Sequence, residues 1–585
     1  MGAEPDAKST PALLASAAAW RDQDPDDETR AELDDLIERA GAGDSEATAD
    51  LADRFAARLE FGTAGLRGAI GAGPNRMNRV LVSQAAAGLA AFLVAREEHP
   101  SAVIGYDGRK NSRVFAEDTA ELLAGAGVRA ILLPRLLPTP VLAFAVRHLD
   151  VSAGVMVTAS HNPAADNGYK VYLGGLDDGS QIVPPSDGEI AEHIEAVAAG
   201  DIRTLPRSQD YELASEDIID AYVDQTAGLA SRSRGNWTGG HAPARLKVVY
   251  TAMHGVGWET AKRVFAKAGF SEPIVVAEQI EPDAAFPTVA FPNPEEPGAL
   301  DLSFALAAAE GAELVIANDP DADRLAIGIP TDTGTDTGTG TDTDGWRRLS
   351  GNEVGTLLGW RIAERLANQP DAVVDKAGTL ANSLVSSPAL AAIARYFHLE
   401  HTETLTGFKW ISRAPGLAFG YEEALGYLVD PHIIRDKDGI SAAVELLSLV
   451  AELKEQGKTL ADHADDFAAK FGAFASSQIS LRVRDLAEIP RLMSRLREQP
   501  PAQIGGVDVS SIDDFIEGFG AFPPNDILRI WTVDGSRVIV RPSGTEPKLK
   551  VYIDASSEEG DAHERQAAAA AKVAVLDAGM RDLIA

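Results

Sequence analysis

The sequence has no cysteine among its 585 residues. This absence excludes a disulfide framework, a zinc thiolate site, an iron–sulfur cluster and a cysteine nucleophile. It fits a reducing compartment, and we expect a cytoplasmic protein. The sequence also lacks any stretch near the ~18 uninterrupted apolar residues of a membrane span, so we expect no integral membrane segment. A secretory signal peptide is not expected either, because Glu4 and Asp6 stand where such a peptide carries cations.

Positive charge is scarce as well. The chain has 53 Lys and Arg residues against 88 Asp and Glu residues, which gives a formal net charge of -35. The summed field repels polyanions, so we expect neither nucleic acid nor an anionic membrane as a partner. An anionic small molecule would have to be met by local cations.

The length predicts several domains. At roughly 150 residues per domain the chain corresponds to about four. From about residue 102, short apolar runs alternate with helical patterns, which is typical of βαβ units. The expected strands are Ala102–Ile104, Val128–Leu133, Ala153–Val157, Lys247–Tyr250, Glu313–Ala317, Gln478–Val483, Arg537–Val540 and Lys548–Asp554. The expected helices include Ser112–Ala126, Val354–Asn368, Ile440–Glu455 and an Ala-rich terminal helix.

Two segments of the chain resemble each other. Val155–His161 and Val248–His254 each place an apolar strand before Thr-Ala-x-His. The second segment has Met253 where the first has Ser160. This pattern favours a duplicated unit in which only the first copy kept a hydroxyl nucleophile, and chance similarity between two strand ends is the alternative.

Ser160 is the first candidate for chemistry. It lies in Thr158-Ala-Ser-His-Asn-Pro163 after an expected strand, which Pro163 prevents from continuing. We therefore expect Ser160 on a turn at a strand end, where its hydroxyl can be exposed to a ligand. Serine needs an adjacent base or metal to act as a nucleophile, and His161 and Lys170 are candidate proton carriers. An ordinary polar turn is the alternative.

Three aspartates form the second candidate site. Asp319, Asp321 and Asp323 follow an expected strand at two-residue spacing, and in extended backbone such side chains project from the same side. A divalent cation would offset their repulsion. An EF-hand is excluded because its sixth position would be Arg324 and its twelfth Pro330, and zinc would ordinarily recruit His or Cys. The pattern predicts a Mg²⁺ site at a strand end, with an acidic solvated turn as the alternative.

A basic cluster near the C-terminus is the third candidate. Ser543, Gly544 and Thr545 form a loop between two expected strands. Backbone N–H groups, two hydroxyls and an arginine fork are what a phosphate needs. A hairpin with cations at its strand edges is the alternative. The nearby cations are Arg537, Arg541, Lys548 and Lys550.

Three further segments are less specific. Gly420–Gly426 offers paired carboxylates, among them Glu422, and Lys437 follows between glycines. Carboxylates accept hydrogen bonds from sugar hydroxyls and a lysine can meet a phosphate. Thr406 lies in a similarly ambiguous polar loop. The low-complexity segment Thr331–Gly345 has nothing to bury, so we expect a flexible surface loop and assign it no function.

Together these motifs resemble the α-D-phosphohexomutase superfamily, which includes phosphoglucomutase and phosphomannomutase. The resemblance extends from Phe61-Gly-Thr-Ala-Gly-Leu-Arg-Gly68 to the Arg-Pro-Ser-Gly-Thr-Glu-Pro loop. It implies an α/β fold with four domains around a central cleft: three similar α/β domains with mixed sheets and a C-terminal α+β domain. The implied domains are 1–215 with the phosphoserine loop, 216–345 with the metal-binding loop, 346–470 with the sugar-binding loop and 471–585 with the phosphate-binding loop.

The resemblance also implies roles for individual residues. Ser160 resembles the phosphorylated serine, and it joins the three aspartates in the implied Mg²⁺ site. His161 and Lys170 resemble the family's acid/base positions. The implied metal ligands are Ser160, Asp319, Asp321 and Asp323. The positions that resemble substrate contacts are Arg67, Arg324, Thr406, Glu422, Lys437, Arg541, Ser543, Gly544 and Thr545.

The implied activity is the interconversion of a sugar 1-phosphate and a sugar 6-phosphate, with glucose as the expected sugar. It would use a phosphoserine enzyme and a sugar 1,6-bisphosphate, with glucose 1,6-bisphosphate as activator. The family's sugar loop usually has Glu-x-Ser, whereas Ala424 stands at the third position here. Other motifs look like the branch with phosphopentomutase-type enzymes and glucose 1,6-bisphosphate synthase, so these activities and mannose specificity stay open.

Two rivals to the mutase stay open as well. A metal-dependent phosphatase would use Ser160 and the aspartates but release phosphate to water. A non-catalytic sugar-phosphate sensor would have lost the nucleophile, and the presence of Ser160 argues against it. In each case the expected partner is a small phosphosugar bound by a monomer or a homodimer.

Overall fold

The structure is a computed structural model that describes residues 10–62, 65–233, 245–331, 345–368, 378–483, 485, 487–543 and 548–584. The chain forms two compact units. The first consists of Met1–Thr331, Thr341–Arg348 and Gly426–Glu445, and the second consists of the remaining residues. The division falls within α14 (Gly439–Glu455). The first unit therefore takes in a segment from late in the sequence.

Three helices open the first unit: α1 (Thr10–Gln23), α2 (Asp27–Gly41) and α3 (Ser45–Ala56). Asp26 and Asp44 begin α2 and α3 as N-caps, each accepting a hydrogen bond from a backbone N–H of the first turn. The helices bury Leu13, Trp20, Leu33, Leu51 and Phe55 together with Ala72 and Val80. The bundle therefore shares its core with the segment that leads into α4.

The first sheet is mixed, with the order β1-β5-β4-β2-β3-β7 and with β6 paired to β5. Strands β4, β2, β3 and β7 run parallel, whereas β5 runs antiparallel to β4 and β1. This reversal sets Lys170 on β5 opposite Met156 on β4. The strands are β1 (Leu66–Ala69), β2 (Ser101–Tyr106), β3 (Arg129–Leu132), β4 (Ala153–Val157), β5 (Asp166–Leu173), β6 (Ser180–Gln181) and β7 (Glu212–Leu213).

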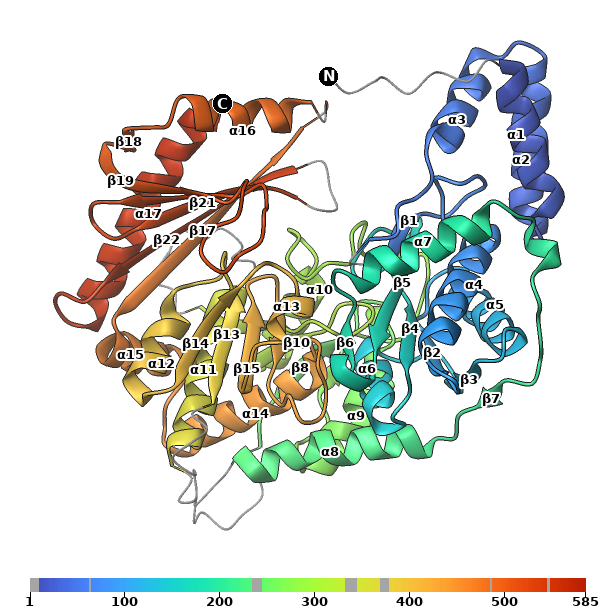
Figure 1. Ribbon diagram of the computed structural model, residues 1–585. Coiled ribbons are helices and arrows are strands. Elements are labelled where there is room, and N and C mark those ends of the chain that lie inside the picture. Colours follow the sequence, from blue (N-terminus) through green and yellow to red (C-terminus); the bar gives the residue numbers. More distant parts are fainter. Residues whose placement is uncertain are drawn as a thin grey trace. The chain divides into compact units, whose positions relative to one another are not determined.

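Helices cover both faces of this sheet (Figure 1). On one face lie α4 (Arg79–Arg96), α5 (Ser112–Gly125) and α7 (Ser186–Ala198), and on the other lie α6 (Thr139–His148) and α8 (Asp217–Ser233). Helix α4 is long and apolar enough to cross a membrane by length and composition, and 67% of its 18-residue window is buried inside the protein. Its buried side chains belong to the core of the first sheet.

The second sheet has the order β12-β11-β10-β8-β9. Strands β9, β8 and β10 run parallel, and β11 and β12 continue antiparallel. It carries the aspartate loop between β10 and β11. Its elements are β8 (Val248–Thr251), α9 (Gly257–Ala268), β9 (Ile274–Val275), α10 (Asp301–Glu310), β10 (Leu314–Ala317), β11 (Ala326–Pro330) and β12 (Trp346–Arg348). The late segment of the first unit contains β16 (Gly426–Leu428), which is not a strand of this sheet, although Gly426 forms an isolated antiparallel bridge with Arg324.

The second unit begins with a parallel layer in which β14, β13 and β15 are neighbours. Its helices bury apolar faces against these strands, as Leu390 and Ile393 of α12 show by their complete burial. The elements are α11 (Gly351–Ala367), β13 (Thr379–Ser383), α12 (Ala389–Phe397), β14 (Glu400–Thr404), α13 (Phe408–Ile411), β15 (Leu417–Glu422) and α15 (Leu460–Phe471).

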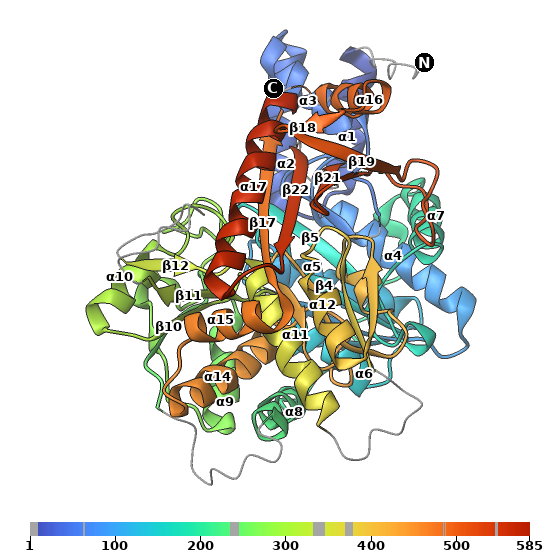
Figure 2. The ribbon, with the colours of Figure 1, turned by 90° about the vertical axis from the view of Figure 1, so that its left-hand side faces the viewer.

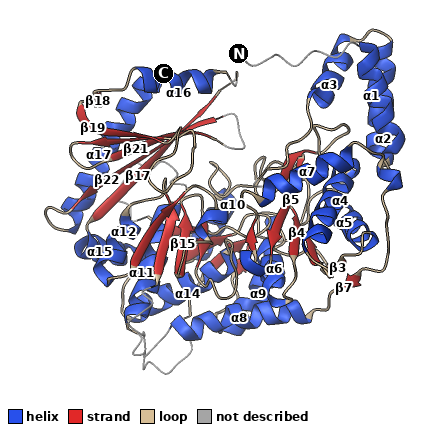
Figure 3. Cartoon of the chain, in the orientation of Figure 1, coloured by secondary structure: helices blue, strands red, loops and turns tan. Residues whose placement is uncertain are grey.

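An antiparallel sheet of order β17-β22-β21-β20-β19-β18 completes the second unit. Helix α17 (Ala562–Ile584) runs along β17 and β22 in two perpendicular views (Figure 1, Figure 2). This part consists of strands together with α16 and α17, and it is therefore α+β (Figure 3). Its elements are β17 (Ala473–Arg482), α16 (Glu488–Glu498), β18 (Gln503–Ile504), β19 (Val507–Asp514), β20 (Leu528–Thr532), β21 (Arg537–Pro542) and β22 (Lys548–Ser557).

The expected α/β fold with mixed sheets and an α+β C-terminal part is confirmed. Most expected strands lie within two residues of their predicted ends, but β17 begins at Ala473, five residues before the predicted start. The domain boundaries near residues 215, 345 and 470 stay predictions. Residues 332–344 of the low-complexity segment lie outside the described residues.

Candidate active site

Ser160 lies in a tight turn at the carboxyl end of β4. Its backbone N–H donates to Thr158 Oγ1 at 2.8 Å, and its φ of 50° lies in the left-handed region. The resembling segment after β8 forms the same turn, since the N–H of Met253 donates to Thr251 Oγ1 at 3.0 Å and Met253 has a φ of 49°. The internal resemblance is therefore a repeated conformation, and at its third position the first copy has the hydroxyl of Ser160 where the second has Met253.

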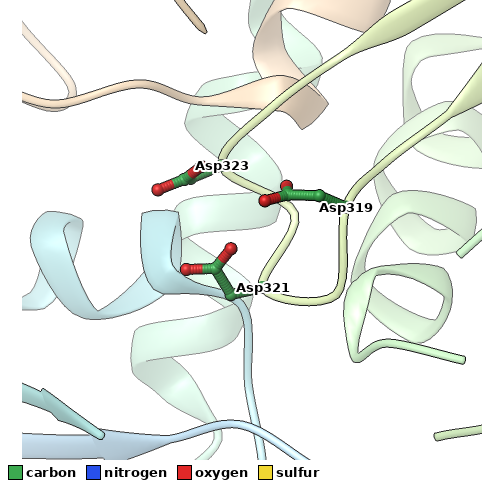
Figure 4. A group of neighbouring side chains, drawn as sticks. All are labelled: Asp319, Asp321 and Asp323. Atoms are coloured by element: carbon green, nitrogen blue, oxygen red, sulfur yellow. The ribbon is translucent and has the colours of Figure 1, made fainter. Parts of the chain in front are cut away.

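Asp319, Asp321 and Asp323 point toward one another in the loop between β10 and β11 (Figure 4). One oxygen from each carboxylate lies within 4.8 Å of the other two, and all three residues are buried. The cause differs from the one that the sequence suggested. The chain is not extended here: it turns, with Ala322 at a φ of 56°, and the turn brings the side chains together.

Backbone hydrogen bonds from three other segments of the first unit hold this loop. The pairs are Val256 N–H to Pro320 O at 2.8 Å, Thr139 N–H to Asp321 O at 2.9 Å and Gly439 N–H to Ala322 O at 3.2 Å. A Cβ at Gly439 would lie only 2.2 Å from Arg324 O, so this approach requires glycine. The loop is therefore fixed by contacts remote in sequence.

The turn at Ser160 and the aspartate loop form one site. Ser160 Oγ donates to Asp319 Oδ2 at 2.7 Å. Ser160 is only 3% exposed, so the expectation of an exposed hydroxyl is wrong for this structure. The reason is that the aspartate loop covers the turn, a long-range contact that local spacing does not reveal.

Three cations face the three carboxylates. Lys170 Nζ lies 2.8 Å from Asp321 Oδ2 and 3.0 Å from Asp323 Oδ2. Lys437 Nζ lies 3.2 Å from Asp323 Oδ2, and Arg324 Nε lies 4.0 Å from Asp323 Oδ1. Burial opposes the ionisation of Asp323, but these cations outweigh it and hold the pKa of Asp323 below its ordinary value. The charges of the cluster are thus balanced within the protein.

The donor set fits a hard divalent cation. Burial, together with repulsion by Asp321 and Asp323, raises the pKa of Asp319 well above its ordinary value. In the part of the chain that the structure describes, Asp321 Oδ1 and Asp323 Oδ1 are buried without a hydrogen-bond partner. Oxygen-only ligands of this kind suit Mg²⁺, and neither cysteine nor histidine is among the grouped residues.

The two candidate proton carriers differ in their surroundings. His161 Nδ1 lies 3.1 Å from Ser160 Oγ. Burial, with Arg324 and Arg67 nearby, lowers the pKa of His161 well below its ordinary value, so its imidazole is neutral near pH 7. Burial also lowers the pKa of Lys170, but attraction to the aspartates outweighs it and raises that pKa overall. Lys170 therefore stays an ammonium.

Arg67 enters the same site from β1. Its strand pairs with β5, where Arg67 lies opposite Gly168. Arg67 Nη1 donates to Asn162 Oδ1 at 3.3 Å, in the loop that follows Ser160. The structure therefore brings together all the predicted site residues of the first unit.

Two predicted sugar contacts lie together in the second unit. Glu422 ends β15, and its Oε1 accepts a hydrogen bond from Gly407 N–H at 2.9 Å. This bond sets Thr406, the residue before Gly407, next to Glu422. The adjacent Glu423 is engaged elsewhere, since its Oε2 accepts from two serine hydroxyls at 2.9 and 3.0 Å.

The predicted phosphate loop joins β21 and β22. Arg541 lies near the end of β21, and the N–H of Ser543 donates to Lys548 O at 2.8 Å across the hairpin. Gly544 and Thr545 lie outside the described residues.

Arg537 does not belong to this basic cluster. It is 2% exposed, and its guanidinium bonds Asp554 Oδ2 at 2.9 Å and Glu403 Oε1 at 2.9 Å. From the sequence, Arg537 is one of the cations near the loop, because it lies on the same strand as Arg541. Its partners are the buried Asp554 of β22 and the partly buried Glu403 of β14, and through them Arg537 helps to hold the second unit together.

Two residues that contact the site were not predicted from the sequence. Thr139, at the start of α6, donates from Oγ1 to Asp321 Oδ2 at 2.7 Å. Arg109, just after β2, binds backbone carbonyls of the Ser160 loop. Arg109 follows β2 by three residues, and Thr139 begins the helix after β3. The carboxyl ends of neighbouring parallel strands meet at one sheet edge, so a position after a strand was the available signal.

Known protein families match most of the chain, from residue 58 to residue 572. The models of the phosphoglucomutase/phosphomannomutase family match as α/β/α domain I (58–200), domain II (220–344), domain III (350–471) and C-terminal domain (479–572). A Haemophilus influenzae protein named "Probable phosphomannomutase" is 53% identical, covering 87% of this chain and 98% of its own.

More distant relatives carry other names. The Homo sapiens phosphopentomutase is 35% identical, over 88% of this chain and 87% of its own. A Staphylococcus epidermidis phosphoglucomutase is 34% identical, over 86% and 92%. Among solved structures, the Paramecium phosphoglucomutase parafusin shares the fold with a TM-score of 0.65 at 20% identity, over 90% of this chain and 95% of its own.

Proposed function

Because the chain belongs to the phosphoglucomutase/phosphomannomutase family, we propose that it interconverts glucose 1-phosphate and glucose 6-phosphate through a phosphoserine at Ser160. The chain is a phosphomutase, and hence an isomerase, as its relatives are. The proposal of a phosphoserine at Ser160 rests on the 2.7 Å hydrogen bond from Ser160 Oγ to Asp319. It joins the serine hydroxyl, which Met253 replaces in the second of the two repeated turns, to a buried acidic cluster.

The proposed reaction has two phosphoryl transfers. In the first, the bond between phosphorus and Ser160 Oγ breaks as a bond to the free sugar hydroxyl forms, which yields the sugar 1,6-bisphosphate. The hydroxyl loses its proton, and Ser160 Oγ gains one. In the second, after the bisphosphate has turned over, its other phosphate returns to Ser160. The net change is the position of the phosphate on the sugar.

The residues around Ser160 fit these needs. His161 Nδ1, at 3.1 Å from Ser160 Oγ, is within reach of the proton that Ser160 exchanges. Lys170 supplies positive charge close to the transfer, because its ammonium lies among the carboxylates. Arg67 and Arg324 are proposed to steady the transferring group, as arginine forks suit phosphoryl oxygens.

Asp319, Asp321 and Asp323 are proposed to hold Mg²⁺, with an oxygen of the phosphorylated Ser160 as a further ligand. The bound ion would stabilise negative charge on the phosphoryl group. Charge balance supports this arrangement. A phosphoserine adds about -1.5 to -2 and Mg²⁺ adds +2, so adding both leaves the already balanced cluster nearly neutral.

Residues of the second unit are proposed to bind the rest of the substrate. Glu422 and Thr406 would accept and donate hydrogen bonds to sugar hydroxyls, and Lys437 of the first unit would contact a phosphate. The loop with Arg541, Ser543, Gly544 and Thr545 would hold whichever phosphate is not reacting. The same loop must bind the bisphosphate in both of its orientations, so losing the Arg541 guanidinium should slow both phosphoryl transfers.

Ser160→Ala tests the phosphoserine. Nucleophile removal should lower kcat by at least about 10³-fold while the protein stays folded. Glucose 1,6-bisphosphate should phosphorylate the resting wild-type enzyme and activate it, and label placed on Ser160 should appear in the product. Near-normal turnover by Ser160→Ala would remove Ser160 from the mechanism. Label lost mainly to water in the presence of substrate would replace the mutase with a phosphatase.

Pentose phosphates are the second candidate substrates. Ala424 lacks the hydroxyl that the family's sugar loop usually carries, and relatives at about a third identity are named phosphopentomutase or phosphoribomutase. The relative at 53% identity points instead to mannose phosphates. Comparing kcat/KM for glucose, mannose and pentose 1-phosphates, with and without bisphosphate, decides among them and reveals any net bisphosphate synthesis.

The cysteine-free composition supports a cytoplasmic location.

A further inference from the structure

Arg109 makes an unusual set of contacts with the loop that carries Ser160. It lies three residues after β2 and is only 4% exposed. Its two terminal nitrogens donate to four backbone carbonyl oxygens of residues 160–166. The acceptors are Ser160 O (2.6 Å), Asn162 O (2.6 Å), Pro163 O (2.8 Å) and Asp166 O (3.2 Å). One side chain thus ties the whole loop together.

These contacts use what is particular to arginine. A guanidinium is planar and presents five N–H donors in a fixed fork, whereas an ammonium is a compact charge on a flexible stem. The fork therefore fixes the relative positions of the carbonyls as well as attracting them. Ser160 needs such support, because its φ of 50° is one that residues other than glycine adopt only when their surroundings hold them there.

Arg109 is itself held from two sides. On one side is Asp107, whose Oδ1 accepts from Arg109 N–H at 3.0 Å and from Ser112 Oγ at 2.6 Å. On the other side is Phe286, whose ring centroid lies 4.9 Å from the Arg109 guanidinium carbon. Phe286 is 4% exposed and comes from the segment between β9 and α10. Arg109 therefore links the Ser160 loop to the part of the unit that carries the aspartates.

Phe286 also belongs to a small apolar cluster beneath the same loop. The cluster contains Met253, Phe286, Val289 and Ala299, with Ala164 of the Ser160 loop packed against it. Met253 is the residue that replaces serine in the repeated turn after β8. The second turn has thus become part of the support for the first.

We propose that Arg109 is a positioning residue for phosphoryl transfer. It fixes the Ser160 loop so that Ser160 Oγ stays within hydrogen-bond distance of Asp319, and it does not contact the substrate. This inference rests on the proposed role of Ser160. The same Oγ must give and take a phosphoryl group in the two half-reactions, so its position matters to both. A displacement of about 1 Å costs on the order of 10²-fold in rate.

The test compares Arg109→Lys and Arg109→Ala with Arg79→Ala. Arg79 is a matched control because it also binds a buried partner, the carboxylate of Asp118, through two bonds of 2.7 and 2.8 Å away from the Ser160 loop. We expect both Arg109 variants to lower kcat about 10²-fold, with KM for glucose 1-phosphate changed less than about threefold. Phosphorylation of Ser160 by glucose 1,6-bisphosphate, followed by intact mass, should slow to match.

Rescue separates positioning from a general loss of structure. Guanidinium ion at tens of millimolar, below denaturing concentration, should restore at least about tenfold of the kcat of Arg109→Ala and nothing in Arg79→Ala. Phe286→Leu removes the ring but keeps the guanidinium, and should give a smaller loss of kcat with the same unchanged KM. If Arg109→Ala fails to fold, Arg109→Lys and Phe286→Leu decide the question.

Three results would overturn the inference. They are a kcat within about threefold of wild type in folded Arg109→Lys, a rise in KM with kcat retained, and a loss of kcat that Arg79→Ala shares and guanidinium does not restore. The Ser160→Ala variant is measured in parallel. Activity in that variant would reject the proposed function itself, whereas an inactive Ser160→Ala beside fully active Arg109 variants would reject only the role of Arg109.

Discussion

Ser160 and Asp319 lie 159 positions apart in the sequence, and their side chains share a hydrogen bond of 2.7 Å. The first follows β4 of one sheet and the second follows β10 of another. Neither sheet contains the site alone. The contact explains why Ser160 is buried and why its chemistry should depend on how the aspartate loop is held.

Mg²⁺ should stabilise the folded protein as well as activate it. Chelator should abolish turnover and Mg²⁺ should restore it, because the bound ion is proposed to stabilise negative charge on the transferring phosphoryl group. At a hundred times Kd, a ligand that binds only the folded state stabilises it by about 2.7 kcal/mol, so the Tm should rise with Mg²⁺. Asp321→Asn should lose both effects, whereas Asp301→Asn, an exposed control, should keep them. Full activity in excess chelator would contradict the metal site.

Shortening the low-complexity segment should change little. The N–H of Thr331 donates to Gly345 O at 2.7 Å, so the ends of the segment already lie together between β11 and β12. A short Gly-Ser turn can join them, and loop-closure entropy varies slowly with length. Replacing residues 332–344 by such a turn should leave Tm within a few degrees and kcat within about twofold. A large loss in either would reveal a role for the Asp-rich segment.

His463 should make the second unit sensitive to mild acid. Its ring stacks on Trp360 with centroids 4.2 Å apart and planes 3° apart. Burial lowers the pKa of His463 to about 4, and neighbouring Lys458, Arg361 and Lys470 add to the effect. The imidazole of the unfolded chain therefore takes up a proton at a higher pH than that of the folded protein. The free energy of unfolding is therefore unaffected by His463 above about pH 6.5, and it falls as the pH drops toward 4. The loss at pH 5 should be about 2 kcal/mol.

His463→Phe is the matched variant, because it keeps an aromatic ring on Trp360 and cannot titrate. The variant should lose less stability than wild type between pH 7.5 and pH 5 in urea denaturation. Carboxylates elsewhere contribute equally to both proteins, so the difference between them isolates His463. Identical pH dependence would show that the imidazole does not stay neutral in the fold.

Arg537 should be a main stabiliser of the second unit. Removing it by Arg537→Met leaves Asp554 and Glu403 without their shared partner, and breaking a buried pair in this way costs about 3–5 kcal/mol. Arg581→Met breaks a pair between the exposed Arg581 and the partly buried Asp577, and should cost less than about 1 kcal/mol. Denaturant midpoints measure both. Equal effects would mean that the network around Arg537 adds nothing beyond a surface pair.

Local motifs predicted those parts of the site whose functional residues are close together in the sequence. Ser160, with its flanking Thr158 and Pro163, was placed on a turn, and the aspartates were grouped by spacing. These motifs did not predict which distant residue contacts each of these side chains. The burial of Ser160 and the donor at Thr139 both depend on residues more than a hundred positions away.

The same limit explains the misassignment of Arg537. From the sequence it is one of several cations on neighbouring strands. Its partner Glu403 lies 134 positions earlier, and no residue near Arg537 in the sequence indicates this pairing. The turn at Ala322 is a second case, because alanine does not favour a positive φ. Tertiary contacts hold that residue in place, so a reading based on extended backbone gave the right cluster for the wrong reason.

The late segment Gly426–Glu445 of the first unit sets an order of events during synthesis on the ribosome. Asp323 emerges well before Lys437, its partner at 3.2 Å. At about 5–20 residues per second, the roughly 110 intervening residues take on the order of 5–20 s to be made. For that interval the nascent first unit carries its acidic loop without Lys437 and without the backbone support of Gly439. Assembly of the candidate active site is therefore a late event, even though its proposed nucleophile, Ser160, lies in the first third of the chain.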